Sequence, residues 1–282
     1  MMSPPSMRHR AEEHHLEPAD HAPQFEVIPV RGIVDEVAAH LPSGARVTIT
    51  ASPAQGLPAT IEVAGALSQR GFHAIPHLAA RMIRGPGEAE ELLGGLAAAG
   101  VAEVFVIAGD APRPAGDLPG ALALLEAVTA VGSGMRVGIG AHPEGHPFAD
   151  EAEAMRLLRA KAEHASYAVT QMCFESAPLL TWTRELRAAG IALPVRPGIA
   201  VPVSTARLLR IGTRIGVGRS LRLLTDADSG VRHLLGPTRW QPAPLLAELE
   251  AAVAAEPELA LLGPHLYTFN ALAAAQDCAA SR

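Results

Sequence analysis

Cysteine and aromatic residues are scarce in this chain. Only Cys173 and Cys278 occur among the 282 residues, and Phe, Trp and Tyr together make up 4%. Two cysteines cannot form a disulfide framework or an all-cysteine metal site, and they fit a reducing compartment, so the cytoplasm is the simplest location. Nearly half of the residues are apolar. The core must therefore consist of Ala, Val, Leu and Ile, which are typical of parallel strands and their covering helices.

Long apolar runs and concentrated positive charge are also missing. No stretch reaches the roughly 18 residues that a membrane span requires, and the net charge is −6 without any Lys/Arg-rich run. Both a membrane span and a nucleic-acid partner are therefore disfavoured, and a small molecule is the expected partner. Residues 1–23 mix Pro, His and charge without an apolar segment. We expect a disordered tail there, followed by one catalytic domain over residues 24–282.

Short β-rich runs alternate with helical stretches, which is typical of βαβ units on a parallel sheet. The predicted strands are Phe25–Pro29, Arg46–Thr50, His73–Pro76, Glu103–Ile107, Arg136–Gly140, Tyr167–Gln171, Leu193–Gly198 and His265–Phe269. The predicted helical stretches are Pro58–Arg70, Gly87–Ala99, Leu118–Val131, Glu151–His164, Ala177–Ala189, Val203–Leu235 and Pro244–Ala255. No Gly-x-Gly-x-x-Gly turn follows any strand, which disfavours an open dinucleotide-binding sheet. The sequence predicts an α/β fold, a single (β/α)8 TIM barrel.

Polar residues gather in or just past the carboxyl ends of these predicted strands. In a barrel such residues converge on one face, where catalytic residues lie. The set comprises Glu26, Thr50, His77, Asp110, His142, His146, Gln171, Tyr267 and Asn270. A metal site at His142-x-Glu144-x-His146 is disfavoured because Pro143 and Pro147 would break the helix needed to align the two imidazoles.

Eight short motifs in order resemble the methylenetetrahydrofolate reductase family. They are FEVIP, VTITAS, IPHLAAR, VIAGDAP, AHPEGHP, AVTQMCF, RPGIAVPVS and HLYTFN, which extend from Phe25 to Asn270. The resemblance implies reduction of 5,10-methylenetetrahydrofolate to 5-methyltetrahydrofolate, with hydride passing from NADH or NADPH through bound FAD. Such a reaction feeds methionine synthesis and one-carbon metabolism. The family often forms oligomers, so a homo-oligomer is also implied.

The resemblance assigns roles to individual positions. Glu26 matches the general acid, and its apolar neighbours in sequence lead us to expect a raised pKa. Asp110 matches a catalytic aspartate that contacts the pterin near the flavin, Gln171 matches the residue that reads the pterin edge, and Tyr267 joins them in substrate binding. The positions that would hold the flavin are Thr50, His77, Gly109, Asp110, His142, His146 and Lys161.

Three departures from the family pattern leave alternatives open. Ala108 stands where the family has Arg, His142 where it has Tyr, and Ala271 where it usually has Arg. Losing cations would weaken contacts with the flavin nucleotide and the folate tail. The alternatives are a folate enzyme that works without flavin or on an altered substrate, for example in methyl transfer, and a non-catalytic barrel that only binds folate or flavin.

Overall fold

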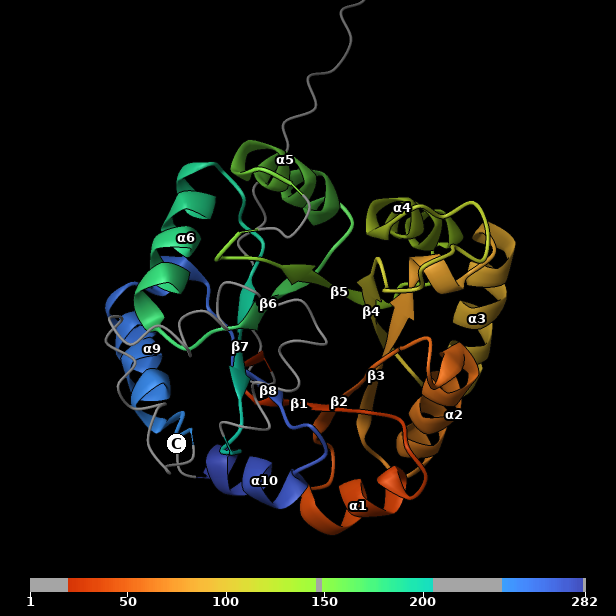
Figure 1. Cartoon of the computed structure of the whole chain (residues 1–282), viewed down its shortest axis with the longest axis horizontal. Helices are drawn as coiled ribbons and strands as arrows, with labels where there is room; N and C mark the ends of the chain where they lie inside the picture. The colour runs from red at the N-terminus through yellow and green to blue at the C-terminus, as the bar shows by residue number, and fades with distance from the viewer. Residues whose placement is uncertain (1–19, 146–148, 205–239, 281–282) are drawn as a thin grey trace, which may run out of the picture.

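Eight parallel strands close into a barrel in which each strand pairs with its neighbours in chain order (Figure 1). The computed structural model describes residues 20–145, 149–204 and 240–280. The strands are β1 (Gln24–Val27), β2 (Arg46–Ile49), β3 (His73–Ala79), β4 (Glu103–Ile107), β5 (Arg136–Ala141), β6 (Tyr167–Met172), β7 (Val195–Ala200) and β8 (His265–Tyr267). The prediction of an eight-stranded TIM barrel is therefore confirmed.

Helices surround the barrel on its outer face (Figure 1). They are α1 (Ile33–His40), α2 (Gly56–Gln69), α3 (Pro86–Ala98), α4 (Ala121–Val131), α5 (Glu151–Ala162), α6 (Ser176–Ala188), α9 (Ala243–Ala255) and α10 (Leu272–Ala280), with short 3-10 turns η2 (Ala80–Met82) and η3 (Pro257–Leu259). Most of the predicted stretch Val203–Leu235 lies outside the described residues. In the described parts, no helix is both long and apolar enough to cross a membrane.

The sequence did not predict helices α1 and α10. These two helices pack against each other where the barrel closes. Helix α1 has eight residues and buries only Ile33 and Val37. Helix α10 has nine residues, with Leu272, Ala275 and Cys278 buried. Such short apolar stripes give little periodic signal, so tertiary packing rather than local pattern determines these helices.

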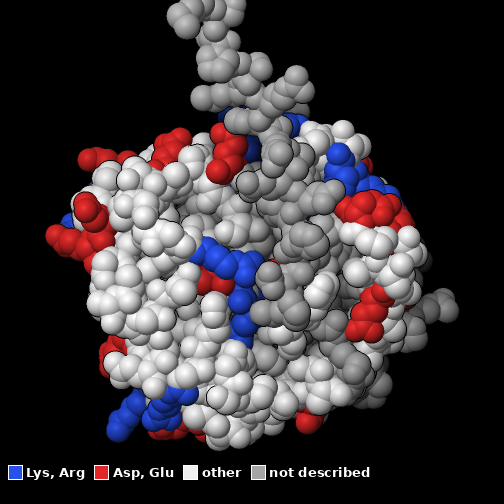
Figure 2. Space-filling view, turned by 180° about the vertical axis from the view of Figure 1, so that it is seen from behind, with Lys and Arg blue, Asp and Glu red and all other residues white. Residues whose placement is uncertain are grey.

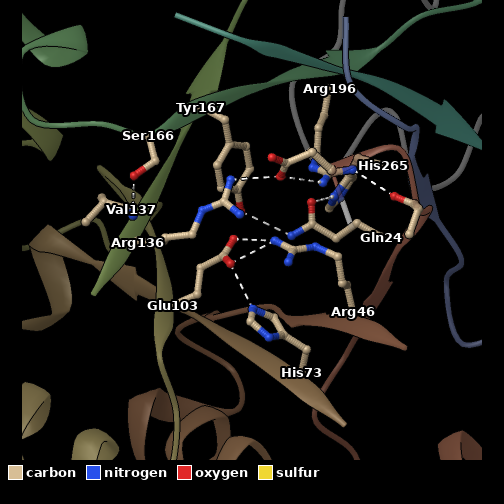
Figure 3. Close-up of polar contacts among 12 residues, drawn as sticks. Gln24, Arg46, His73, Glu103, Arg136, Val137, Ser166, Tyr167, Arg196 and His265 are labelled. Carbon is tan, nitrogen blue, oxygen red and sulfur yellow. Dashed lines mark hydrogen bonds and ion pairs between the residues drawn. The ribbon is translucent and has the colours of Figure 1, made fainter. Parts of the chain in front are cut away.

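The amino ends of the strands enclose a buried ionic network (Figure 3). Arg46 Nη2 lies 2.6 Å from Glu103 Oε1 and 2.8 Å from Glu103 Oε2, and His73 Nε2 lies 2.8 Å from the same Oε2. Burial alone would raise the pKa of Glu103, but the hydrogen bond from His73 and the charge of Arg46 outweigh it and lower that pKa to about 2. Glu103 is therefore ionised at neutral pH and depends on both partners.

Two more arginines flank the ring of Tyr167 at the same end of the barrel. The guanidinium carbons of Arg136 and Arg196 lie 5.7 and 5.6 Å from the ring centroid, and Asp20 accepts a hydrogen bond of 2.9 Å from Arg136. Figure 2 shows this end from outside, with basic and acidic atoms at its centre. Asp20 is itself buried.

A register shift between β6 and β7 begins after Val169 and shapes the opposite end of the barrel. It depends on Gly198, where an added Cβ would lie 2.3 Å from the Thr170 carbonyl oxygen, 2.8 Å from that of Gln171 and 2.8 Å from the ring of Tyr267. The Gly198 amide donates to the Thr170 hydroxyl at 2.8 Å. Irregular pairing of this kind redirects side chains near active sites. Gly198 thus allows both Gln171 and Tyr267 to occupy their places.

We predict that Glu103→Gln lowers the free energy of unfolding by about 3 kcal/mol, because it leaves Arg46 buried without its counter-charge. The folded-state pKa of about 2 lies below the ordinary 4.5, so this stability is present above pH 4.5 and is lost as the pH falls toward 2. Urea unfolding at several pH values measures the difference between the two proteins. The exposed Glu153→Gln, which also breaks an arginine pair, is the control and should unfold like the wild type. A Glu103→Gln protein that is equally stable at neutral pH would contradict the assignment.

We also predict that Gly198→Ala lowers the free energy of unfolding by about 3 kcal/mol, because the methyl group would overlap main-chain oxygens that cannot move independently. Gly140 in β5 is the matched control, since a Cβ there meets nothing within 4 Å. Gly140→Ala should leave stability unchanged or slightly higher, because alanine restricts the unfolded chain. Thermal or urea unfolding of both variants tests this prediction. Equal unfolding midpoints would contradict it, because they would show that the backbone of β6 moves to accommodate the methyl group.

Candidate active site

Glu26 lies between two imidazoles at the carboxyl half of the barrel. Its Oε2 is 3.3 Å from His265 Nε2 and 3.8 Å from His77 Nε2. Residues 26 and 265 come from β1 and β8, the first and last strands, which pair directly where the barrel closes. The three side chains are 17%, 2% and 7% exposed for Glu26, His265 and His77. The Glu26 carboxyl and the two imidazoles therefore lie together in a largely buried environment.

The two histidines reverse the pKa shift expected for Glu26 from its apolar neighbours. Burial raises the pKa of Glu26, but the hydrogen bond and charge of His265 and the charge of His77 outweigh burial and hold that pKa below its ordinary value. The expectation of a raised pKa in the free protein is therefore wrong, because it considered only neighbours in sequence. Burial also lowers the pKa of His77 to about 4. His77 is therefore neutral at neutral pH, and its charge acts on Glu26 only in acid.

His265 connects Glu26 to the interior of the barrel. Its Nε2 faces the Glu26 carboxylate, which can only accept, and its Nδ1 lies 3.4 Å from Gln24 Oε1. The sequence-based set of site residues did not include His265. The available signal was its spacing from Tyr267, because residues two apart in a strand point to the same face.

Tyr267 forms part of the wall beside His265. The two rings pack edge to face with centroids 4.7 Å apart, and the Tyr267 hydroxyl donates to the Thr170 carbonyl oxygen at 2.8 Å. Burial raises the pKa of Tyr267 well above its ordinary value. The Tyr267 hydroxyl thus links β8 to β6. The Tyr267 ring packs against His265, the imidazole that pairs with Glu26.

The end of β8 anchors the segment that follows Glu26. The Asn270 side chain accepts from the Ile28 amide at 2.8 Å and donates to the Ile28 carbonyl oxygen at 3.1 Å. Phe269 and Asn270 both have positive φ, at 51° and 61°, a conformation that costs energy in residues other than glycine. Asn270 was expected on the ligand-binding face, but the structure shows its amide pairing with the backbone of the β1 end.

Gln171 and Asp110 stand at the ends of β6 and β4. Gln171 is half-buried, and its main-chain carbonyl accepts from the Thr170 hydroxyl at 2.9 Å. Asp110 is exposed and follows Gly109, whose φ is 84°. A Cβ on Gly109 would lie 2.8 Å from the Cβ of Ala79, so the turn passes very close to the end of β3. Within the described residues, neither polar side chain has a hydrogen-bond partner inside the protein, so both are available to a ligand.

The remaining predicted residues lie around the same rim. Lys161 is half-buried, its Nζ is 3.4 Å from the Gly140 carbonyl oxygen, and burial lowers its pKa. Among the residues that the structure describes, it forms no salt bridge. Thr50 is tied by its backbone to Val27, and His142 is half-buried after β5. His146 lies outside the described residues.

Comparisons with known proteins point to one family. The model of the family described as methylenetetrahydrofolate reductase matches residues 31–218. The protein "Methylenetetrahydrofolate reductase 1" of Schizosaccharomyces pombe is 38% identical over 105 residues, which cover 34% of this chain and 17% of that protein. The chain therefore spans under a fifth of that relative's length in the matched part.

Solved structures of other enzymes are more distantly similar. 2,3-Dimethylmalate lyase has a TM-score of 0.49 at 12% identity, with 86% of this chain and 94% of that chain covered. Dihydropteroate synthase from Thermus thermophilus has a TM-score of 0.46 at 16% identity, with 92% of both chains covered.

The ordered motifs, the closed barrel that carries them and the match over residues 31–218 lead to one conclusion. The chain belongs to the methylenetetrahydrofolate reductase family.

Proposed function

We propose that this protein reduces 5,10-methylenetetrahydrofolate to 5-methyltetrahydrofolate with NADH or NADPH. The observation that carries the proposal is the Glu26 carboxyl held between His265 and His77 in a barrel of this family. The balanced reaction consumes one proton and one hydride. Methionine synthesis as the destination of the product, a cytoplasmic location and a homo-oligomer stay predictions.

Glu26 supplies the proton in this scheme. Its carboxyl group donates to a nitrogen of the five-membered folate ring, a carbon–nitrogen bond opens to give an iminium, and hydride then adds to the methylene carbon. The pKa of Glu26 is low in the free protein, so Glu26 must take up a proton when folate binds. A ligand that covers the site removes water and so raises this pKa. His265 Nε2, 3.3 Å away, is placed to exchange the proton with Glu26.

Asp110 and Gln171 are proposed to orient the pterin. A pterin ring presents both donors and acceptors at its edge, and a carboxylate with an amide can satisfy both. Tyr267 would contact the substrate through its ring, because its hydroxyl is bonded to Thr170. Asp110 would also act electrostatically on the ring during reduction, as the family pattern implies.

Several residues fit a bound FAD in part. Lys161 is a half-buried cation without an acidic partner among the described residues, and such a cation suits a flavin phosphate. Thr50, His77, Gly109, Asp110 and His142 would lie along the remainder, and His146 is proposed from the family pattern alone. A bound FAD would accept hydride from the nicotinamide and pass it on to the folate.

Direct hydride transfer from the nicotinamide to the folate is the second candidate. Ala108 follows β4 where the family carries a cation, and Ala271 stands where a second cation is usual. The proton chemistry of Glu26 serves both routes equally. Altered folate chemistry or a barrel that binds ligand without turnover are the outcomes that remain if neither route operates.

We predict that Glu26→Gln lowers kcat for methylenetetrahydrofolate reduction at least about 100-fold, because glutamine cannot donate the proton. Folding and folate binding should persist, as checked by thermal unfolding and by titration with 5-methyltetrahydrofolate. In the wild type kcat/KM should rise as the pH falls through the neutral range, because more Glu26 is protonated, and the variant should lose this dependence. Glu90→Gln, an exposed change on α3, is the control. Unchanged turnover in Glu26→Gln would exclude the proposed role.

The visible absorption spectrum distinguishes the two routes. If FAD is bound, the purified protein should show flavin bands that bleach with anaerobic NADH and recover with methylenetetrahydrofolate. A colourless protein that oxidises NADH only when folate is present would establish direct transfer. A protein that binds folate but consumes neither NADH nor NADPH would refute the proposed activity.

A further inference from the structure

The Arg81 guanidinium binds the turn that carries Asp110. Its Nε donates to the Ala111 carbonyl oxygen at 2.7 Å, and its Nη2 donates to the Pro112 carbonyl oxygen at 2.9 Å. These are the two carbonyls immediately after Asp110. Hydrogen bonds from a guanidinium are charge-assisted, and two from one rigid group fix direction as well as distance.

The backbone of Arg81 holds the same turn at two more points. Its amide donates to the Ala108 carbonyl oxygen at 2.9 Å, and its carbonyl oxygen accepts from the Ala115 amide at 2.9 Å. One residue of η2 therefore binds the chain before and after Asp110. Residues 108–117 contain no regular secondary structure that would hold them otherwise.

Close packing fixes the position of this turn against β3 and η2. Gly109 approaches Ala79, and an added Cβ on Gly116 would lie 1.8 Å from the Arg84 carbonyl oxygen. The Asp117 amide donates to that same oxygen at 3.0 Å. The Asp110 carboxylate is exposed and has no hydrogen bond to the described residues, so its position depends on the backbone beneath it.

We propose that Arg81 is a positioning residue that holds the Asp110 carboxylate at the folate ring. The proposal rests on the proposed function, because Asp110 matters there only if the pterin binds beside it. Arg81 acts through Asp110 and itself touches neither substrate nor cofactor. The guanidinium also brings a cation to a turn that lacks the family's arginine at position 108, but its two side-chain bonds go to main-chain carbonyls.

The test compares Arg81→Met with Arg113→Met, a matched loss of an exposed arginine from the same turn. Hydrogen–deuterium exchange of the segment 108–117 should accelerate at least about tenfold in Arg81→Met and stay at the wild-type rate in Arg113→Met. The kcat/KM for methylenetetrahydrofolate should fall about 100-fold in Arg81→Met, whereas the KM for NADH should not change. The global unfolding midpoint, measured alongside, shows that the barrel remains folded.

A double-mutant cycle with Asp110→Asn separates positioning from general destabilisation. If Arg81 acts through Asp110, adding Arg81→Met to Asp110→Asn should cause little further loss of kcat/KM. Independent, multiplying losses would overturn the proposal, and so would unchanged exchange of the segment 108–117. Failure of the proposed function looks different, because the wild type itself would then not reduce the folate while the exchange effect of Arg81→Met would persist.

Discussion

The pairing of β1 with β8 is the contact on which the candidate site depends. It places Gln24 opposite His265 and Glu26 opposite Tyr267, and it thereby joins residues more than 230 positions apart. Three side-chain contacts link the two strands or the residues just after them. Glu26 contacts His265, the Thr268 hydroxyl donates to the Glu26 carbonyl oxygen, and the Asn270 amide donates to the Ile28 carbonyl oxygen. A barrel that failed to close would lose its proposed acid together with the groups that set its pKa.

The two ends of the barrel handle charge in opposite ways. At the amino end, permanent charges compensate one another, with Arg46, Arg136 and Arg196 balanced largely by Glu103 and Asp20. Burial, together with the neighbouring charge of Arg46, lowers the pKa of Arg196 to about 10, yet Arg196 remains charged at neutral pH. Such an end is suited to stability, because its carboxylates are held by arginines that stay charged over the neutral range.

The carboxyl end instead pairs Glu26 with groups whose charge depends on protons. His77 is neutral at neutral pH because burial lowers its pKa to about 4, and the pKa of Glu26 follows the charge of its imidazole neighbours. A ligand that displaces water therefore changes the balance between burial and attraction. This balance would allow the proposed acid, Glu26, to be ionised in the free protein and to take up a proton when folate binds.

Much of the architecture could be predicted from the sequence. The eight strands stood out because buried parallel strands are short apolar β-rich runs, and the ordered motifs identified the family and placed Glu26, Asp110 and Gln171 at strand ends. The sequence did not predict the short helices α1 and α10. Their apolar stripes are weak, and their packing against each other provides the stability that the local sequence lacks.

Local sequence determined which residues stand at the carboxyl ends of the strands, and hence which side chains can share a site. Only the tertiary structure decided their electrostatics and support. The pairing of β1 with β8 brings His265 beside Glu26, which lowers the Glu26 pKa instead of raising it. The Asn270 side chain binds the backbone of Ile28. The Arg81 guanidinium binds the backbone of the turn that carries Asp110. Each of these depends on a neighbour in space that lies far away in sequence, because pKa values and side-chain partners follow distance and burial and not chain order.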